Sequence, residues 1–119
     1  MAQDGQQGCV FCRIVAKQVP SHEVWSGDLT YAFHDMHPVA PVHVLVVPRQ
    51  HIPDASGLRP EHGLVLAEMF EAARVVAERL GTVESGYRLA VNVGRDSGAE
   101  VAHLHMHVLG GRRLSWPPG

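Results

Sequence analysis

The stretch His103-Leu104-His105-Met106-His107-Val108-Leu109 places three histidines at every second position, with apolar residues between them. Side chains of a β-strand alternate between its two faces, so a strand over residues 103–109 would carry all three imidazoles on one face. Neighbouring imidazoles would lie roughly 6.6 Å apart along the strand, which lets one phosphate group touch two of them. The stretch therefore predicts a sheet strand with an apolar face and a candidate anion site opposite it.

Two other interpretations of the three histidines stay open at this point. They could be polar residues on the solvated face of an edge strand, although Thr, Lys and Glu are more usual there. They could also bind a transition metal, but three positions two apart on a flat strand are too spread to share one ion easily. The preceding loop favours the anion site, because Gly94 and Gly98 let backbone N–H groups approach closely and Asn92 and Ser97 add side-chain donors.

The rest of the chain divides into short strand-like and helix-like segments. Runs of β-branched and aromatic residues bounded by Gly, Pro and Asp predict further strands over residues 22–26, 29–34, 43–47 and 87–93. Apolar residues at helical spacing predict a short helix over residues 10–17 and a long one from about residue 60 to 80. Because the links between strands are mostly short, we expect an α+β domain: a five-stranded antiparallel sheet with a helix packed on one face.

Composition restricts the classes of function. The chain has 119 residues and 45% hydrophobic residues, which suits one domain with a core that needs no disulfides. The formal net charge of −2 gives no basic surplus, so we expect no nucleic-acid partner. No apolar run approaches the ~20 residues of a membrane helix, so we expect no membrane partner. The polar residues 1–8 lack the apolar core of a signal peptide, which predicts a disordered leader on a cytoplasmic protein.

The triad resembles that of the histidine triad (HIT) superfamily, whose signature is His-φ-His-φ-His-φ-φ with φ apolar. The resemblance covers nearly the whole chain after residue 8. Its further motifs are Val10-Phe11-Cys12-Arg13-Ile14, Phe33-His34-Asp35, Ala40-Pro41-Val42-His43, Val47-Pro48-Arg49-Gln50-His51-Ile52 and Asn92-Val93-Gly94. The ending Trp116-Pro117-Pro118-Gly119 is similar to that of the Hint branch, the nucleoside phosphoramidases.

The resemblance implies an architecture. It predicts a single HIT domain over residues 9–119, with a C-terminal tail over residues 111–119. Two protomers would form a homodimer with a continuous ten-stranded sheet and the long helix in the interface. Trp116 would then help to shape the leaving-group side of the other protomer's pocket, unless the tail packs on its own subunit.

The resemblance also implies an activity, that of a purine nucleoside phosphoramidase. Such a hydrolase cleaves the P–N bond of nucleoside 5′-phosphoramidates and aminoacyl adenylate-like substrates. His105 would attack the α-phosphorus and form a nucleotidyl-histidine, which water then releases. His107 would contact the phosphate and help to move a proton to the leaving group, while His43 and His103 complete the catalytic set. Superfamily transferases have Gln at the position of His107, so hydrolysis is favoured over nucleotidyl transfer. The resemblance also implies that catalysis requires no cofactor.

A purine nucleotide pocket is implied on the same grounds. Asp35 matches the family's ribose anchor, although its place in the sequence equally suits a residue that starts a loop. Core packing is the alternative role for the apolar wall. The residues that we expect to contact AMP or GMP are Val10, Phe11, Ile14, Phe33, His34, Asp35, Met36, Leu45, Asn92, Gly98, Val101, His105 and His107. Glu100 departs from the Ser of Hint proteins; its carboxylate would repel a phosphate but could receive a cationic amine leaving group.

The pair Cys9 and Cys12 has the two-residue gap of zinc-binding cysteines, a weak signal by itself. In a cytoplasmic protein such a pair is more often a metal or redox site than a disulfide. The resemblance to bacterial HIT proteins adds His51 and His103, which would complete a structural zinc site. A metal-free pair that packs like small apolar residues is the alternative.

Two other functions stay open. The chain could be a nucleotide-binding sensor or scaffold with little turnover, or a dinucleoside polyphosphate hydrolase like the Fhit branch. The intact set of His43, His105 and His107 favours an enzyme over a sensor, and the ending Trp116-Pro117-Pro118-Gly119 favours the phosphoramidase.

Overall fold

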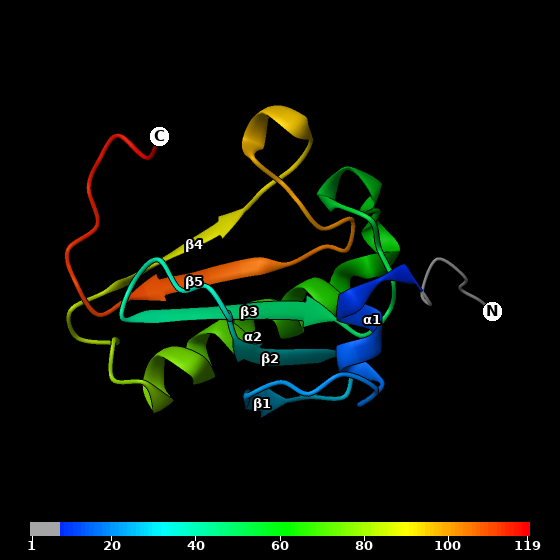
Figure 1. Cartoon of the computed structure of the whole chain (residues 1–119), viewed down its shortest axis with the longest axis horizontal. Helices are drawn as coiled ribbons and strands as arrows, with labels where there is room; N and C mark the ends of the chain where they lie inside the picture. Colours follow the sequence, from blue (N-terminus) through cyan, green and yellow to red (C-terminus); the bar gives the residue numbers. More distant parts are fainter. Residues whose placement is uncertain (1–7) are drawn as a thin grey trace.

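The computed structural model describes residues 8–119, so the predicted leader lies outside the described residues apart from Gly8. The strands are β1 (Glu23–Ser26), β2 (Thr30–His34), β3 (Val42–Pro48), β4 (Tyr87–Val91) and β5 (Met106–Gly110), and the helices are α1 (Val10–Val15) and α2 (Gly63–Arg79). They form one sheet in the order β1-β2-β3-β5-β4, and every neighbouring pair is antiparallel. The predicted α+β fold, a five-stranded antiparallel sheet with two helices, is therefore confirmed (Figure 1).

The two helices cover opposite faces of the sheet. On one face, Met69, Ala72 and Val76 of α2 pack against Val44 and Val46 of β3 in the larger apolar core. These helix positions recur at intervals of three and four residues, as one face of an amphipathic helix requires. Figure 1 shows α2 running behind the sheet and α1 in front of it.

The second face carries a smaller core under α1. Phe11 and Ile14 of α1 pack there with Phe33 of β2 and with Leu45 and Val47 of β3. The central strand β3 thus sends alternate side chains into two cores, so its run of β-branched residues is buried on both faces. Because α1 is short, it covers only part of this face, and the histidines lie beside it.

The last strand begins later than the sequence predicts. Pairing of β5 with its neighbours starts at Met106, which pairs with Val46 of β3 and Val91 of β4. Residues 103–105 lie before Met106, outside the ladder. The next ladder partner for Leu104 would be Pro48, which has no N–H to donate. The Leu104 N–H instead donates to the Ile52 carbonyl at 2.6 Å. The prediction of a strand from residue 103 is therefore wrong by three residues.

The predicted sharing of faces nevertheless holds. Leu104, Met106 and Val108 all lie in the core under α2. The rings of His103 and His105 lie against Phe11 of α1, on the opposite face, with ring centroids 5.8 and 5.2 Å away. That face is covered rather than solvated, because His103 is fully buried and His105 is 9% exposed.

The helices also differ slightly from their predicted bounds. The short helix ends at Val15 rather than at residue 17, and Cys9 caps its N-terminus by accepting from the Cys12 N–H at 3.4 Å. A 3-10 turn over Pro60–His62 leads into α2, and Gly81 follows its end with a φ of 76°. Within residues 8–119, no helix is long and apolar enough to cross a membrane.

Candidate active site

His105 is held in one orientation by its own chain. Its Nδ1 lies 2.8 Å from the backbone carbonyl oxygen of His103. A carbonyl oxygen can only accept, so Nδ1 carries the proton and Nε2 keeps its lone pair. The edge of the ring rests on Phe11, which restricts its rotation. His105 thus has the tautomer and the limited freedom that a nitrogen nucleophile needs.

A second hydrogen-bonded chain starts at the loop before β3. The Val39 N–H donates to Nδ1 of His43 at 3.1 Å, so the proton of a neutral His43 is on Nε2. That Nε2 lies 2.9 Å from Nδ1 of His107 and 3.3 Å from Oδ2 of Asp35. When His43 donates to Nδ1 of His107, the single N–H of a neutral His107 is at its Nε2. The His107 ring lies beside that of His105, with centroids 5.1 Å apart.

Burial keeps the His43 and His107 imidazoles neutral near pH 7. Desolvation, followed by the nearby charge of His105 and His43, lowers the pKa of His107 to about 4, against a smaller opposing effect of Asp35. Burial also lowers the pKa of His43, and Asp35 partly opposes it. Neutral rings can attack or donate through one nitrogen, whereas charged rings would have no lone pair.

These histidines open onto a cavity of about 780 Å³, within the usual range for small-molecule sites. All thirteen residues expected to contact a nucleotide line it, including the apolar Val10, Phe11 and Leu45 and the polar Asp35 and Asn92. Nucleotide binding itself stays a prediction. The lining residues outside that expected set are Pro20, Ser21, His22, His37, Val39, His43, Ala99 and Glu100. His22, predicted to be the first residue of a strand, directly precedes β1, and Pro20, Ser21, His37, Val39 and Ala99 come from segments where no periodic pattern marked them.

The loop between β4 and the histidines contributes less than its sequence suggested. Gly98 lines the cavity and adopts a φ of 84°, a conformation that favours glycine. The Ser97 hydroxyl, predicted to be a free donor, donates to the Gly94 carbonyl at 2.6 Å and does not line the cavity. Asn92 donates one amide hydrogen to the Ser97 carbonyl at 2.8 Å. Asn92, which keeps a second amide hydrogen, and the Gly98 backbone are loop groups that line the cavity and could meet an anion.

Asp35 is anchored at the ribose side of the expected pocket. Its Oδ1 accepts from the His37 N–H at 2.8 Å, which is the loop role that the sequence also allowed. Its Oδ2 faces His43. Both roles are compatible, because each carboxylate oxygen can accept more than one hydrogen bond.

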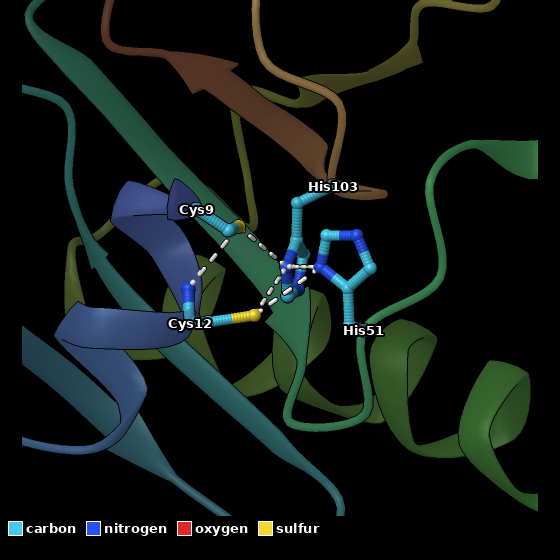
Figure 2. Close-up of side chains that lie close together, drawn as sticks. All are labelled: Cys9, Cys12, His51 and His103. Atoms are coloured by element: carbon cyan, nitrogen blue, oxygen red, sulfur yellow. Dashed lines mark hydrogen bonds between the residues drawn. The ribbon is translucent and has the colours of Figure 1, made fainter. Parts of the chain in front are cut away.

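The four predicted metal ligands come together beside this site. Figure 2 shows Cys12 of α1 and Cys9, which precedes that helix, facing the rings of His51 and His103, and the four ligand atoms all lie within 4.8 Å of one another. His103 Nδ1 is 3.3 Å from Cys9 Sγ, 3.5 Å from Cys12 Sγ and 3.2 Å from His51 Nδ1. A tetrahedral zinc ion needs separations of about 3.6 Å between N and S and about 3.3 Å between two N ligands, from its bond lengths. The cluster is therefore the right size for such an ion.

The surroundings of the cluster also suit a metal. Nε2 of His103 donates to the Pro48 carbonyl at 2.9 Å, which leaves Nδ1 with its lone pair toward the cluster. Burial, and then Cys9, raises the pKa of the Cys12 thiol to about 12. A bound cation would reverse this, since metal-bound thiols lose their protons. The residues present thus fit zinc in donor type, spacing and orientation.

The C-terminal tail lies on its own subunit. Arg88 of β4 donates to the Ser115 carbonyl at 3.0 Å, and its guanidinium lies 5.5 Å from the centre of the Trp116 ring. The indole itself stays 77% exposed. Contact with its own subunit, one of the two alternatives for the tail, is thus present in the protomer.

The chain is similar to known proteins in sequence and in fold. The family model described as the HIT domain matches residues 16–114. A relative named purine nucleoside phosphoramidase, from Escherichia coli strain K12, is 43% identical over 105 residues, which are 88% of each chain. A HIT family hydrolase from Legionella pneumophila Philadelphia 1 has a TM-score of 0.91 at 39% identity, covering 93% of this chain and 99% of its own. A Zn-bound histidine triad family protein from Mycobacterium smegmatis has a TM-score of 0.76 at 28% identity, covering 97% and 82%.

Proposed function

Because the chain belongs to the HIT-domain family, we propose that it is a purine nucleoside phosphoramidase that hydrolyses the P–N bond of nucleoside 5′-phosphoramidates. The observation that carries this proposal is the pairing of two oriented imidazoles, His105 and His107, at one cavity that also presents Asp35. The 43% identity to a phosphoramidase supports the same reaction class.

The reaction proceeds in two steps. The Nε2 lone pair of His105 attacks the α-phosphorus, an N–P bond forms to His105, and the P–N bond to the amine breaks. The amine leaves with the electron pair of that bond and takes up one proton. Water then attacks the phosphorus of the nucleotidyl-histidine and gives a proton to Nε2 of His107. The N–P bond to His105 breaks, the nucleoside monophosphate leaves, and His105 regains its Nε2 lone pair.

His107 supplies the proton for the leaving amine. It is neutral in the free protein, and the negative charge of a bound α-phosphate raises its pKa, so that it binds a proton as the substrate enters. In the neutral ring His43 donates to Nδ1, so the hydrogen of His107 is already on Nε2, toward the substrate. The added proton is bound at Nδ1, beside the Asp35 carboxylate, and makes the Nε2–H acidic enough to be transferred. Asn92 and the Gly98 backbone stabilise the charge on the phosphoryl oxygens.

The nucleoside lies in the remainder of the cavity. Phe11, Ile14 and Phe33 provide an apolar slot for a purine, and the Asp35 carboxylate accepts from the ribose hydroxyls. An apolar slot distinguishes adenine from guanine weakly, so we expect turnover of both AMP and GMP derivatives.

We propose in addition that Cys9, Cys12, His51 and His103 hold a structural zinc ion. Four protein ligands fill a tetrahedral site and leave no position for substrate. The ion would supply cross-linking between α1 and the segments at residues 51 and 103. Metal analysis of protein purified without added zinc tests this: about one zinc per chain is expected. Much less than one zinc, with both thiols freely reactive, contradicts it.

We also propose a homodimer with a sheet continued across β4. Strand β4 is an edge of the sheet, and its Val91 is exposed, as are Leu64 and Phe70 of α2. Apolar groups on an edge strand and a helix face are stabilised by a second copy. Sedimentation of the wild type and of Phe70→Lys tests this, since a dimer should give way to a monomer in the variant. A monomeric wild type at micromolar concentration contradicts it.

The activity is tested by steady-state release of amine from an adenosine 5′-phosphoramidate, with wild-type protein and His105→Ala. Turnover by the wild type and a loss of several orders of magnitude in the variant are expected. Faster cleavage of a diadenosine polyphosphate than of the phosphoramidate would identify a dinucleoside polyphosphate hydrolase instead. AMP binding without turnover of either substrate would identify a nucleotide sensor.

A further inference from the structure

The candidate nucleophile lies outside the sheet ladder. Met106 is the first residue of β5 that pairs with a neighbouring strand, and His105 comes directly before it. Inside a ladder, hydrogen bonds to two neighbouring strands would fix the backbone of a catalytic residue. His105 has no such support in the described structure, so other contacts must hold it in place.

Three hydrogen bonds hold the segment 103–105. The Leu104 N–H donates to the Ile52 carbonyl at 2.6 Å, and the His103 ring donates to the Pro48 carbonyl at 2.9 Å. The His103 carbonyl in turn accepts from His105 at 2.8 Å. The first two join the segment 103–105 to the segment 48–52, and the third lies within the segment that they hold.

The metal cluster joins these same two segments (Figure 2). His51 adjoins the acceptor Ile52, and His103 carries the carbonyl that orients the nucleophile. The other two ligands, Cys9 and Cys12, flank Phe11, whose ring packs on both His103 and His105. Two contacts of His105, with the His103 carbonyl and with Phe11, thus involve a ligand residue or a residue beside one; its other ring contact is with His107.

We propose that the cluster, when it holds a metal ion, positions the nucleophile by fixing the His103 carbonyl to which His105 donates. Cys9, Cys12 and His51 are then positioning residues for the reaction, although none of them touches the substrate. This inference rests on the proposed role of His105, but its structural part is measurable without turnover.

The same geometry shows why an empty cluster would be looser. Nδ1 of His103 presents a lone pair to His51 Nδ1 at 3.2 Å and to two sulfur atoms. Without a cation, weak S–H donors and a single N–H must satisfy this centre, and they do so in several arrangements. A nucleophile displaced by about 1 Å loses roughly 100-fold in rate, because attack requires a near-linear approach to phosphorus.

The experiment compares full-length protein loaded with zinc, stripped by a chelator, and reloaded. Histidine ring ¹⁵N spectra at pH 7 report the tautomer of His105, and amide exchange reports the Leu104 N–H. On stripping, we expect the His105 Nδ1–H signal to broaden and Leu104 exchange to accelerate at least tenfold. We expect kcat on an adenosine phosphoramidate to fall 10- to 100-fold with KM changed less than threefold, and reloading to restore all three.

Two variants separate positioning from general stability. The double substitution of Ser for Cys9 and Cys12 should reproduce the stripped state and no longer respond to zinc. Val76→Ala, in the core under α2, should lower the unfolding temperature without changing kcat or the His105 signal. Retention of the His105 signal, the Leu104 protection and kcat after stripping overturns the proposal, as does a loss of kcat of the same size in Val76→Ala. If no phosphoramidate is cleaved at all, the spectra and the exchange rates still decide the structural part.

Discussion

Replacement of His43 tests the hydrogen-bonded chain that orients His107. In His43→Leu the donor to Nδ1 of His107 disappears, and the Asp35 carboxylate is the remaining acceptor near that nitrogen. The neutral His107 ring is then more stable with its proton on Nδ1, because Nδ1–H can donate to Asp35. Its Nε2 presents a lone pair, instead of a hydrogen, to the substrate.

The magnitude follows from the loss of one donor at the reacting phosphate. Removing a single preorganised donor of this kind costs about 10²- to 10³-fold in kcat. We therefore expect His43→Leu to lower kcat by about that factor, with KM changed much less because the nucleoside contacts remain. His43→Gln is the matched control, since its amide N–H can replace the lost donor, and it should keep at least tenfold more activity than His43→Leu.

Steady-state kinetics and ¹⁵N spectra of the His107 ring provide the assay. The expected result is a proton on Nε2 in the wild type and in His43→Gln, and on Nδ1 in His43→Leu. Equal impairment of the two variants would refute the argument, because it would mean that the lost group acts by its shape and not by its donor. An unchanged kcat in His43→Leu would refute it more directly.

Three further predictions follow from charge and burial around the same cavity. The pKa of His107 is lowered to about 4, while an unfolded histidine has about 6.5. The unfolded chain therefore takes up a proton between pH 6.5 and 4 that the folded chain does not, so the free energy of unfolding falls as pH drops through that window. By pH 4.5 this loss amounts to about 2 to 3 kcal/mol. Urea unfolding of His107→Gln should show a pH dependence smaller by that amount. Binding of adenosine 5′-(O-methyl phosphate), an anion that does not itself titrate near pH 6, should take up part of a proton at pH 5.5, and calorimetry in buffers of different ionisation enthalpy should find no uptake in His107→Gln. Glu100 lines both the main cavity and a hollow beside His105 that also contains Asp54, and among the described residues no Lys or Arg lines either of them. Glu100→Gln should therefore lower kcat/KM about two- to fivefold for a leaving group that carries a second ammonium, relative to a neutral amine of equal length.

Much of the fold could be predicted from the sequence because the signals were local. The run around Val44 and the turn residues between strands mark strands directly, and the spacing of Met69, Ala72 and Val76 marks the face of α2. The histidine pattern, together with the motifs along the chain, is specific enough to indicate the family, and that assignment is confirmed. Short connections then left antiparallel pairing as the simplest topology.

The parts that could not be predicted depend on partners distant in sequence. Nothing near Ser97 shows that its hydroxyl is used within its own loop, and nothing near Pro48 shows that its carbonyl accepts from the His103 ring. Cysteines two residues apart indicate a metal site only weakly; the two histidines were added by resemblance, because they lie 39 and 91 residues beyond Cys12. The cavity residues His22 and His37 belong to loops, whose course no periodicity reports.

The late start of β5 explains how the shared face of the three histidines could be predicted correctly although the strand was predicted to start too early. Alternation of side chains belongs to any extended backbone, whether or not a neighbouring strand pairs with it, so the histidines share a face beyond the end of the ladder. The end of pairing at Met106 frees the His103 carbonyl from the sheet, and it can accept from the His105 ring. In the proposed site, His103 would serve catalysis through its backbone carbonyl and the metal through its ring, so the two predictions made from the sequence do not compete for the same atoms.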